Sequence, residues 1–198
     1  MAIKVGIVAI QGAVSEHVDT VERTLKSLDL KGSAVQVRRL PDLEGVQALI
    51  IPGGESTTIG KLLVKFGLFE RIIARAKDGM PIMGTCAGCI LLAKEGDDQV
   101  SKTDTKLLGL MDMAVDRNAF GRQRESFETD LKVEGMKAPF HAVFIRSPAI
   151  LRTWGKCKPL AVFEDKIVIA KQGNLLAMTF HPELTPDLRF HSLLVEMI

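Results

Sequence analysis

The sequence predicts an α/β fold, in which a single domain is built around a mostly parallel central sheet with helices on both faces. In the first half of the chain, short runs rich in Ile and Val alternate with amphipathic helical segments, the pattern of parallel strands covered by helices. In the second half, strand-like runs are separated only by turns, which favours an antiparallel extension of the sheet. The 198 residues, 46% of them hydrophobic, suit one domain spanning residues 1–198 with a substantial core.

The expected strands are short apolar runs that stop at Gly, Pro or polar residues. In the first half they cover residues 3–10, 35–39, 47–51 and 81–84. In the second half they cover residues 127–134, 140–145, 160–164, 167–171 and 175–180. Glu164-Asp165-Lys166 joins two of these runs, and so short a polar connection predicts a tight hairpin.

Helices are expected where apolar residues recur at three- and four-residue spacing. The first follows residue 12, with Ser15 as its N-cap and an apolar face made of Val18, Val21, Leu25 and Leu28. Two more cover residues 68–77, which end at Asp78-Gly79, and residues 90–94. A last helix starts near Pro186, with an apolar face made of Phe190, Leu193, Leu194 and Met197. Residues 95–106 are polar and lack periodicity, so a surface loop is expected there.

The charge balance argues against several classes of partner. With 26 basic and 24 acidic residues the formal net charge is +2, which gives no electrostatic footprint for nucleic acid or for an anionic membrane. No apolar run approaches the roughly 20 residues that span a bilayer, and the start lacks the features of a secretory signal. A cytoplasmic protein is therefore expected, and its three cysteines are expected to be free thiols. The cluster of Arg117, Arg122 and Arg124 suits either a solvated face or a small anion site.

A candidate nucleophile lies where a buried strand turns into a helix, at Gly84-Thr85-Cys86-Ala87-Gly88. Small neighbours allow a sharp turn that exposes the Cys86 side chain, and the helix N-terminus favours its thiolate. The N–H of Ala87 is placed to donate to an oxyanion, as in a nucleophile elbow. Two other interpretations remain open: a buried structural cysteine, and a redox dithiol formed with Cys89. A zinc site is not expected, because only these two cysteines and scattered histidines are available.

A candidate base follows the last expected strand, at His181-Pro182-Glu183. Histidine can accept and return a proton near neutral pH, and a glutamate two residues on can hold one ring nitrogen. A histidine at a strand end beside a solvated glutamate would leave the same pattern. The cysteine elbow far upstream favours the catalytic interpretation, because a Cys–His pair needs such a nucleophile.

Longer sequence blocks resemble one family, the triad-type (class I) glutamine amidotransferases, and within it the glutaminase subunits of pyridoxal phosphate synthases. In chain order the blocks are Gln11-Gly12-Ala13 with Glu16-His17, Pro52-Gly53-Gly54-Glu55-Ser56-Thr57, Gly84-Thr85-Cys86-Ala87-Gly88, Arg117-Asn118-Ala119-Phe120-Gly121-Arg122-Gln123, Ser126-Phe127-Glu128, Phe144-Ile145-Arg146, Lys171-Gln172-Gly173 and Phe180-His181-Pro182-Glu183-Leu184-Thr185. The resemblance covers nearly the whole chain and implies a class I amidotransferase-like, flavodoxin-like fold.

The resemblance also implies roles for individual residues. Cys86 would be the nucleophile, His181 the base and Glu183 the residue that orients it, with Gly54 and Ala87 forming an oxyanion hole. The substrate L-glutamine would be bound by Gly54, Glu55, Ser56, Arg117, Ile145 and Arg146. Gln11 would lie where ammonia leaves toward a partner, the (β/α)-barrel subunit of a pyridoxal phosphate synthase. The reaction would need no metal and no organic cofactor.

Cys89 departs from the family pattern, because an aliphatic residue is expected there. It places a second thiol one helical turn from the nucleophile and raises the question of oxidative inactivation. Three other functions remain as alternatives: a free-standing cysteine hydrolase of γ-glutamyl or peptide bonds on the same fold, a non-catalytic interaction subunit, and a thiol redox protein that uses Cys86 and Cys89.

Overall fold

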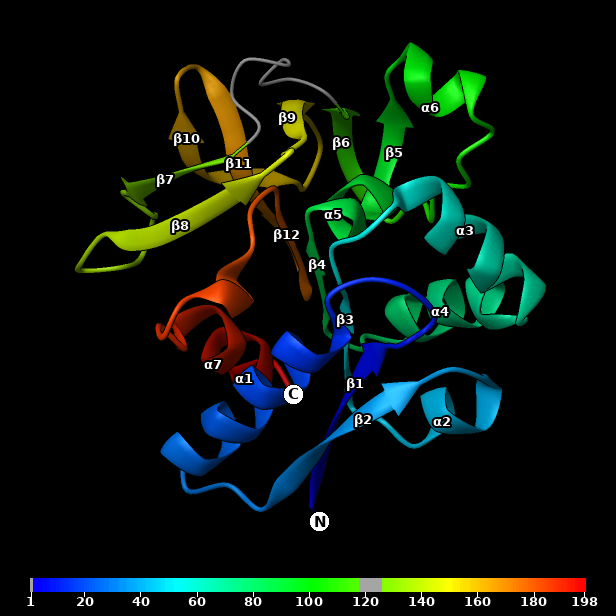
Figure 1. The fold of residues 1–198 in the computed structure, drawn as a ribbon, viewed down its shortest axis with the longest axis vertical. Coiled ribbons are helices and arrows are strands. Elements are labelled where there is room, and N and C mark those ends of the chain that lie inside the picture. The colour runs from blue at the N-terminus through cyan, green and yellow to red at the C-terminus, as the bar shows by residue number, and fades with distance from the viewer. Residues whose placement is uncertain (1, 118–125) are drawn as a thin grey trace.

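The computed structural model describes residues 2–117 and 126–198, and its main feature is a ten-stranded mixed sheet (Figure 1). Across the sheet the order is β2 (Gly32–Val37), β1 (Ile3–Val8), β3 (Ala48–Ile51), β4 (Ile82–Thr85), β12 (Leu175–Met178), β11 (Lys166–Gln172), β9 (Ala149–Thr153), β6 (Met111–Asp116) and β5 (Ala93–Gly96). The tenth strand, β10 (Lys158–Phe163), pairs with β11.

The first five strands of this order are parallel to one another, as the sequence predicted. Their arrangement, with the first strand flanked by the second and third, is the flavodoxin-like order. From β12 onward, β11, β9 and β6 add in antiparallel fashion, and the turn between β10 and β11 is the expected hairpin. Glu164 and Asp165 both have positive φ there (45° and 63°), as a type I′ turn requires.

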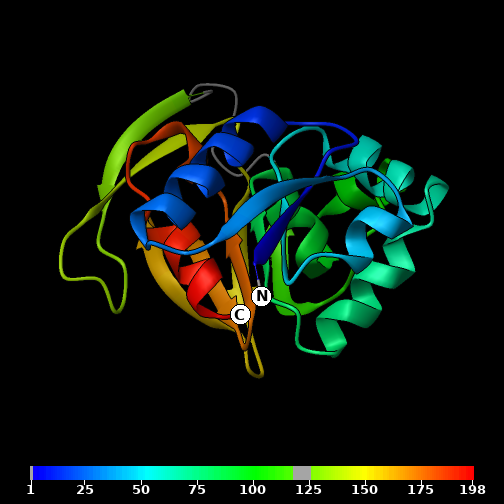
Figure 2. The same ribbon diagram turned by 90° about the horizontal axis from the view of Figure 1, so that it is seen from below.

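Helices cover both faces of the sheet (Figure 2). One face carries α1 (Val14–Ser27) and α7 (Arg189–Glu196). The other face carries α2 (Leu40–Glu44), α3 (Ser56–Lys65), α4 (Leu68–Lys77) and α5 (Ala87–Leu92). β3 shows how the sheet separates two cores: Ala48 and Ile50 pack with the first set of helices, whereas Leu49 and Ile51 pack with the second. Because both faces are buried, the strand reads as a continuous apolar run.

Two strands that were expected to extend the central sheet form a separate ribbon instead, β7 (Ser126–Leu131) and β8 (Phe140–Ile145). Alternate residues of β8 explain the difference. Phe140, Ala142 and Phe144 are fully buried in the core under α1 and α7, and the Phe140 ring meets the edge of Phe190 at 4.6 Å between centroids. The ribbon therefore covers a face of the main sheet and does not lengthen it.

The prediction of a loop at residues 95–106 was wrong, because this segment contains the end of β5 and a short helix, α6 (Asp98–Lys102). The Asp97 side chain caps α6 by accepting a hydrogen bond from the Val100 N–H (2.9 Å). The N-cap expected at Ser15 was also wrong. Helix α1 begins at Val14 with Ala13 as its N-cap, two residues earlier than expected, and the Ser15 hydroxyl donates to Glu16. No helix in the described part of the chain is both long and apolar enough to cross a bilayer.

Gly88 provides a test of this packing, because a Cβ there would overlap the carbonyl oxygen of Ile51. We expect Gly88→Ala to lower the free energy of unfolding by about 1–3 kcal/mol, the usual cost of overpacking. Gly45→Ala is a matched control, since its φ is −84° and a Cβ would meet nothing closer than 3.9 Å. Urea denaturation of both variants checks the prediction, and equal stabilities would contradict the close contact.

Candidate active site

Cys86 occupies the turn between β4 and α5 in a backbone conformation that side chains rarely adopt, with φ 49° and ψ −104°. Its N–H donates to the Met178 carbonyl of β12 (2.8 Å), which ties the turn to the neighbouring strand. A Cβ at Gly84 would lie 2.5 Å from the Gly88 carbonyl oxygen, so the turn closes only with a glycine at that position. The expected cysteine elbow is therefore present, and 8% of Cys86 remains exposed.

His181 and Glu183 follow β12 and form a hydrogen bond of 2.7 Å between Nδ1 and Oε1. The backbone N–H of His181 donates to Val143 on β8, so the ribbon also positions this residue. Burial acts to lower the pKa of His181, but Cys86 and Glu183 outweigh it and raise the pKa to about 10. With Nδ1 held by Glu183, Nε2 is the ring nitrogen available to the thiol.

Gly53 brings the cysteine and the histidine together. A Cβ on Gly53 would overlap Cε1 of His181 and lie 3.3 Å from the Cβ of Cys86, so both side chains rest against this glycine. The Cys86 sulfur also lies 4.0 Å from the Ile145 carbonyl oxygen. Ile145 and Arg146 are exposed beside the nucleophile, and Arg146 has a φ of 44°. The structure thus places the Ile145 carbonyl next to the Cys86 sulfur, and the substrate-binding role expected for Ile145 and Arg146 stays a prediction.

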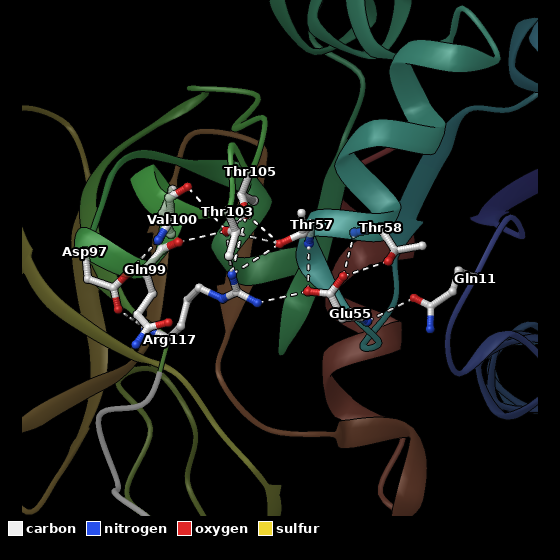
Figure 3. Close-up of polar contacts among 10 residues, drawn as sticks. All are labelled: Gln11, Glu55, Thr57, Thr58, Asp97, Gln99, Val100, Thr103, Thr105 and Arg117. Atoms are coloured by element: carbon white, nitrogen blue, oxygen red, sulfur yellow. Dashed lines mark hydrogen bonds and ion pairs between the residues drawn. The ribbon is translucent and has the colours of Figure 1, made fainter.

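Glu55, in the loop that follows Gly54, forms an ion pair with Arg117 (Figure 3). Arg117 Nη2 donates to Glu55 Oε1 at 2.9 Å, while Nη1 donates to Thr103 (3.0 Å) and Thr57 (3.2 Å). The Glu55 carboxylate caps α3, because it accepts from the N–H groups of Thr57 and Thr58. Partial burial acts to raise the pKa of Glu55, but these hydrogen bonds lower it to about 2.

Gln11 lies against the loop at residues 53–55. Its Oε1 accepts from the Glu55 N–H (2.9 Å), and the neighbouring Ala13 N–H donates to the Gly53 carbonyl (3.0 Å). The segment after β1 is therefore hydrogen-bonded to the loop that contains Gly54. Ser56, also expected to bind substrate, is 2% exposed, and its hydroxyl finds no partner among the described residues.

The other two thiols lie in less reactive surroundings. Cys89 is fully buried among the apolar residues under α3 and α4, and burial raises the pKa of its thiol. Burial, with a smaller effect of Asp112, raises the pKa of Cys157 to about 11. All three cysteines are free. Ala87, directly after Cys86, is the first residue of α5, so its N–H has no acceptor within the helix.

Sequence reasoning missed the polar residues around Arg117. Asp97 accepts from the Arg117 backbone N–H (3.0 Å), and Thr103 and Thr105 hold the guanidinium from a segment expected to be a loop. The signal available was Asp97, a helix-capping residue three positions before the buried Val100. Arg122 and Arg124 of the expected cluster, and the block after Arg117, lie outside the described residues. Among the described residues, no three His, Cys, Asp or Glu side chains form a group that could hold a metal ion.

A flavodoxin-like sheet with a cysteine elbow beside a His–Glu pair is the framework of a thiol-dependent α/β enzyme. Residues 7–198 match the SNO glutamine amidotransferase family, and the chain belongs to that family.

Relatives and solved structures agree with this assignment. The chain is 49% identical to the pyridoxal 5′-phosphate synthase subunit PdxT of Methanosarcina barkeri over 98% of both chains, and 51% identical to that of Archaeoglobus fulgidus, again over 98% of both. It is also similar to a crystal structure of a glutamine amidotransferase, with a TM-score of 0.86 and 46% identity over 98% of this chain and 97% of that one. PurLQS from Thermotoga maritima shares the fold alone, with a TM-score of 0.67 and 17% identity over the full length of both chains.

The surroundings of the three thiols predict which one reacts. A glutamine-like diazo-ketone should add a single label, at Cys86, because this thiol lies at the N-terminus of α5 beside His181, whereas burial raises the pKa values of Cys89 and Cys157. Peptide mass spectrometry checks the position. Cys86→Ala should lose the label and keep the fold, whereas Cys89→Ala should keep the label. A label on Cys89 or Cys157 would contradict the assignment.

Proposed function

We propose that this chain is the glutaminase subunit of a pyridoxal phosphate synthase, hydrolysing L-glutamine to L-glutamate and ammonia in vitamin B6 biosynthesis. The observation that carries the proposal is the cysteine elbow at Cys86 beside the hydrogen-bonded pair His181–Glu183, in a member of a glutamine amidotransferase family. The relatives named pyridoxal 5′-phosphate synthase subunit PdxT support the choice of partner.

In the proposed reaction the Cys86 thiolate attacks the side-chain carboxamide carbon of glutamine. The N–H groups of Ala87 and Gly54 stabilise the oxyanion, and the His181 imidazolium gives its proton to the departing ammonia. A thioester to Cys86 remains. Neutral His181 then takes a proton from water, whose hydroxide attacks the thioester and releases glutamate. Glu183 holds Nδ1 throughout, so that the ring keeps one tautomer.

The amino-acid end of glutamine suits the polar groups beside the nucleophile. At neutral pH this end carries one ammonium and one carboxylate, and the Glu55–Arg117 pair offers one charge of each sign. Ser56, Ile145 and Arg146 complete the proposed binding site. Thr57, Thr103 and Thr105 fix the guanidinium of Arg117, so that little rearrangement is needed when substrate enters.

Ammonia released into bulk water would be protonated and lost as a nucleophile, so it must pass to the partner's (β/α)-barrel across an interface. Gln11, at the proposed exit, is hydrogen-bonded to Glu55 in the loop that contains Gly54. The φ of Gly54, 159°, lies at the edge of the region that only glycine adopts readily, and its peptide can turn at small steric cost. Docking beside Gln11 would in this way complete the oxyanion hole.

Two substitutions separate the hydrolase from a redox dithiol. His181→Asn should lower glutamine hydrolysis by at least about 10²–10⁴-fold, the usual contribution of general acid–base catalysis. Cys89→Ala should keep most of the activity, because one thiolate suffices for acyl transfer. The measurement is steady-state glutamate release with the partner present. The opposite ranking of the two variants would favour the redox interpretation.

Partner control is tested by the same assay with and without a purified pyridoxal phosphate synthase. We expect the isolated chain to be slow, and the synthase to raise turnover by about 10²–10³-fold, the contribution of one oxyanion-hole donor. Cys86→Ala in the complex is the control and should be inactive. Full activity in the isolated chain, unchanged by the synthase, would instead indicate a free-standing cysteine hydrolase.

A further inference from the structure

Two further buried histidines lie beyond Glu183 in a chain of contacts. Three of the four histidines are buried: His181, His17 on α1 and His191 on α7. Nε2 of His17 lies 3.4 Å from Glu183 Oε2 and 3.2 Å from Thr85 Oγ1, and its Nδ1 lies 3.1 Å from Nε2 of His191. His17 thus contacts both the residue before the nucleophile and the partner of the base.

The second oxygen of Glu183 needs a donor. Glu183 has no exposed side-chain surface, and Oε2 makes no hydrogen bond of good geometry within the described residues. Burial acts to raise the pKa of Glu183, but the neighbouring His17 and the hydrogen bond from His181 act in the opposite direction, and the pKa is lowered overall. A buried carboxylate without compensation would be costly, and the Nε2–H of His17 lies 3.4 Å from Oε2.

The contacts also place the protons of the two rings. Carboxylate oxygen accepts only, so His17 carries its proton on Nε2. Burial is the main cause that lowers the pKa of both His17 and His191, so each ring is neutral at neutral pH. Glu183 and Glu16 act to raise the pKa of His17, whereas His181 lowers it further. The pKa of His191 is lowered further by His17 and Arg23. Nδ1 of neutral His17 is then an acceptor for the Nε2–H of His191. Nδ1 of His191 is left as a bare acceptor, and it is the one ring nitrogen of the pair that finds no partner among the described residues.

We propose that His17 is a positioning residue of this site: its Nε2–H, 3.4 Å from Glu183 Oε2, attracts that oxygen and keeps the carboxylate oriented, so that Oε1 faces His181. The proposal rests on the function proposed above for Cys86, His181 and Glu183. His191 fixes the tautomer of His17 from α7, and Thr85 shares the His17 proton from the end of β4. The orientation of the base therefore depends on α1 and α7, which contribute no group that touches substrate.

The test replaces His17 in two ways. His17→Leu removes the donor, whereas His17→Gln keeps an amide N–H near the Nε2 position. His141→Leu is the matched control, because His141 is half exposed and binds Asp130 and Glu128 outside this chain of histidines. The first readout is the ¹³C titration of the Glu183 carboxyl in the isolated chain, which needs neither partner nor turnover. The second is kcat and KM for glutamate release in the complex with synthase.

We expect His17→Leu to move the Glu183 titration to higher pH by about one unit and to lower kcat by about 10- to 100-fold with KM nearly unchanged, as loss of a hydrogen bond to a charged group predicts. His17→Gln should restore most of both, and His141→Leu should change neither. An unchanged Glu183 titration in the His17→Leu variant would overturn the proposal. A shift in His17→Leu that His17→Gln does not reverse would overturn it as well.

Thr85→Val gives an independent measure if His17→Leu fails to fold. Without the Thr85 hydroxyl, Glu183 Oε2 remains as the acceptor near the His17 Nε2–H. The stronger interaction should move the Glu183 titration to lower pH. An unchanged or raised titration in that variant would overturn the proposal. Loss of all glutaminase activity in the wild-type complex, with the expected titration shifts intact, would instead count against the proposed function and leave the role of His17 supported.

Discussion

The site depends on keeping one buried carboxylate ionised. Glu183 has no exposed side-chain surface; one oxygen is paired with His181, and the other lies 3.4 Å from Nε2 of the neutral His17 ring. These residues come from the segment after β12 and from α1, so the chain must fold before the charge is compensated. The core under α1 and α7 thereby couples the stability of that layer to the chemistry at Cys86.

The site also requires two glycines, where other groups approach the backbone too closely for a side chain. Gly53 and Gly84 leave space that a side chain would fill, against His181 in one case and against the α5 backbone in the other. The parallel strands β3, β4 and β12 end at the same edge of the sheet, which is where open α/β sheets place their ligands. Residues far apart in the sequence meet there because adjacent strands deliver them together.

The sequence predicted the parts of the molecule that local patterns determine. Helix α4 has the expected bounds at Leu68–Lys77, and β8 has the expected bounds at Phe140–Ile145. Helices α3 and α6 were missed although each begins at a capping carboxylate, Glu55 for α3 and Asp97 for α6, and α3 has a buried apolar face made of Ile59 and Leu63. At the site, motifs identified Cys86, His181 and Glu183. Local patterns gave no indication of the Glu55–Arg117 ion pair or of the His17–His191 contact, because each joins distant parts of the chain.

The Glu55–Arg117 pair adds no net charge to the entrance of the site. In the proposed reaction, glutamine arrives as a zwitterion of zero net charge, whereas glutamate departs with one extra negative charge, created beside the Cys86 sulfur. The Glu55–Arg117 pair contributes no net attraction that would retain that anion. An ion pair that binds the zwitterion in the proposed way would therefore add little to the affinity for the product anion.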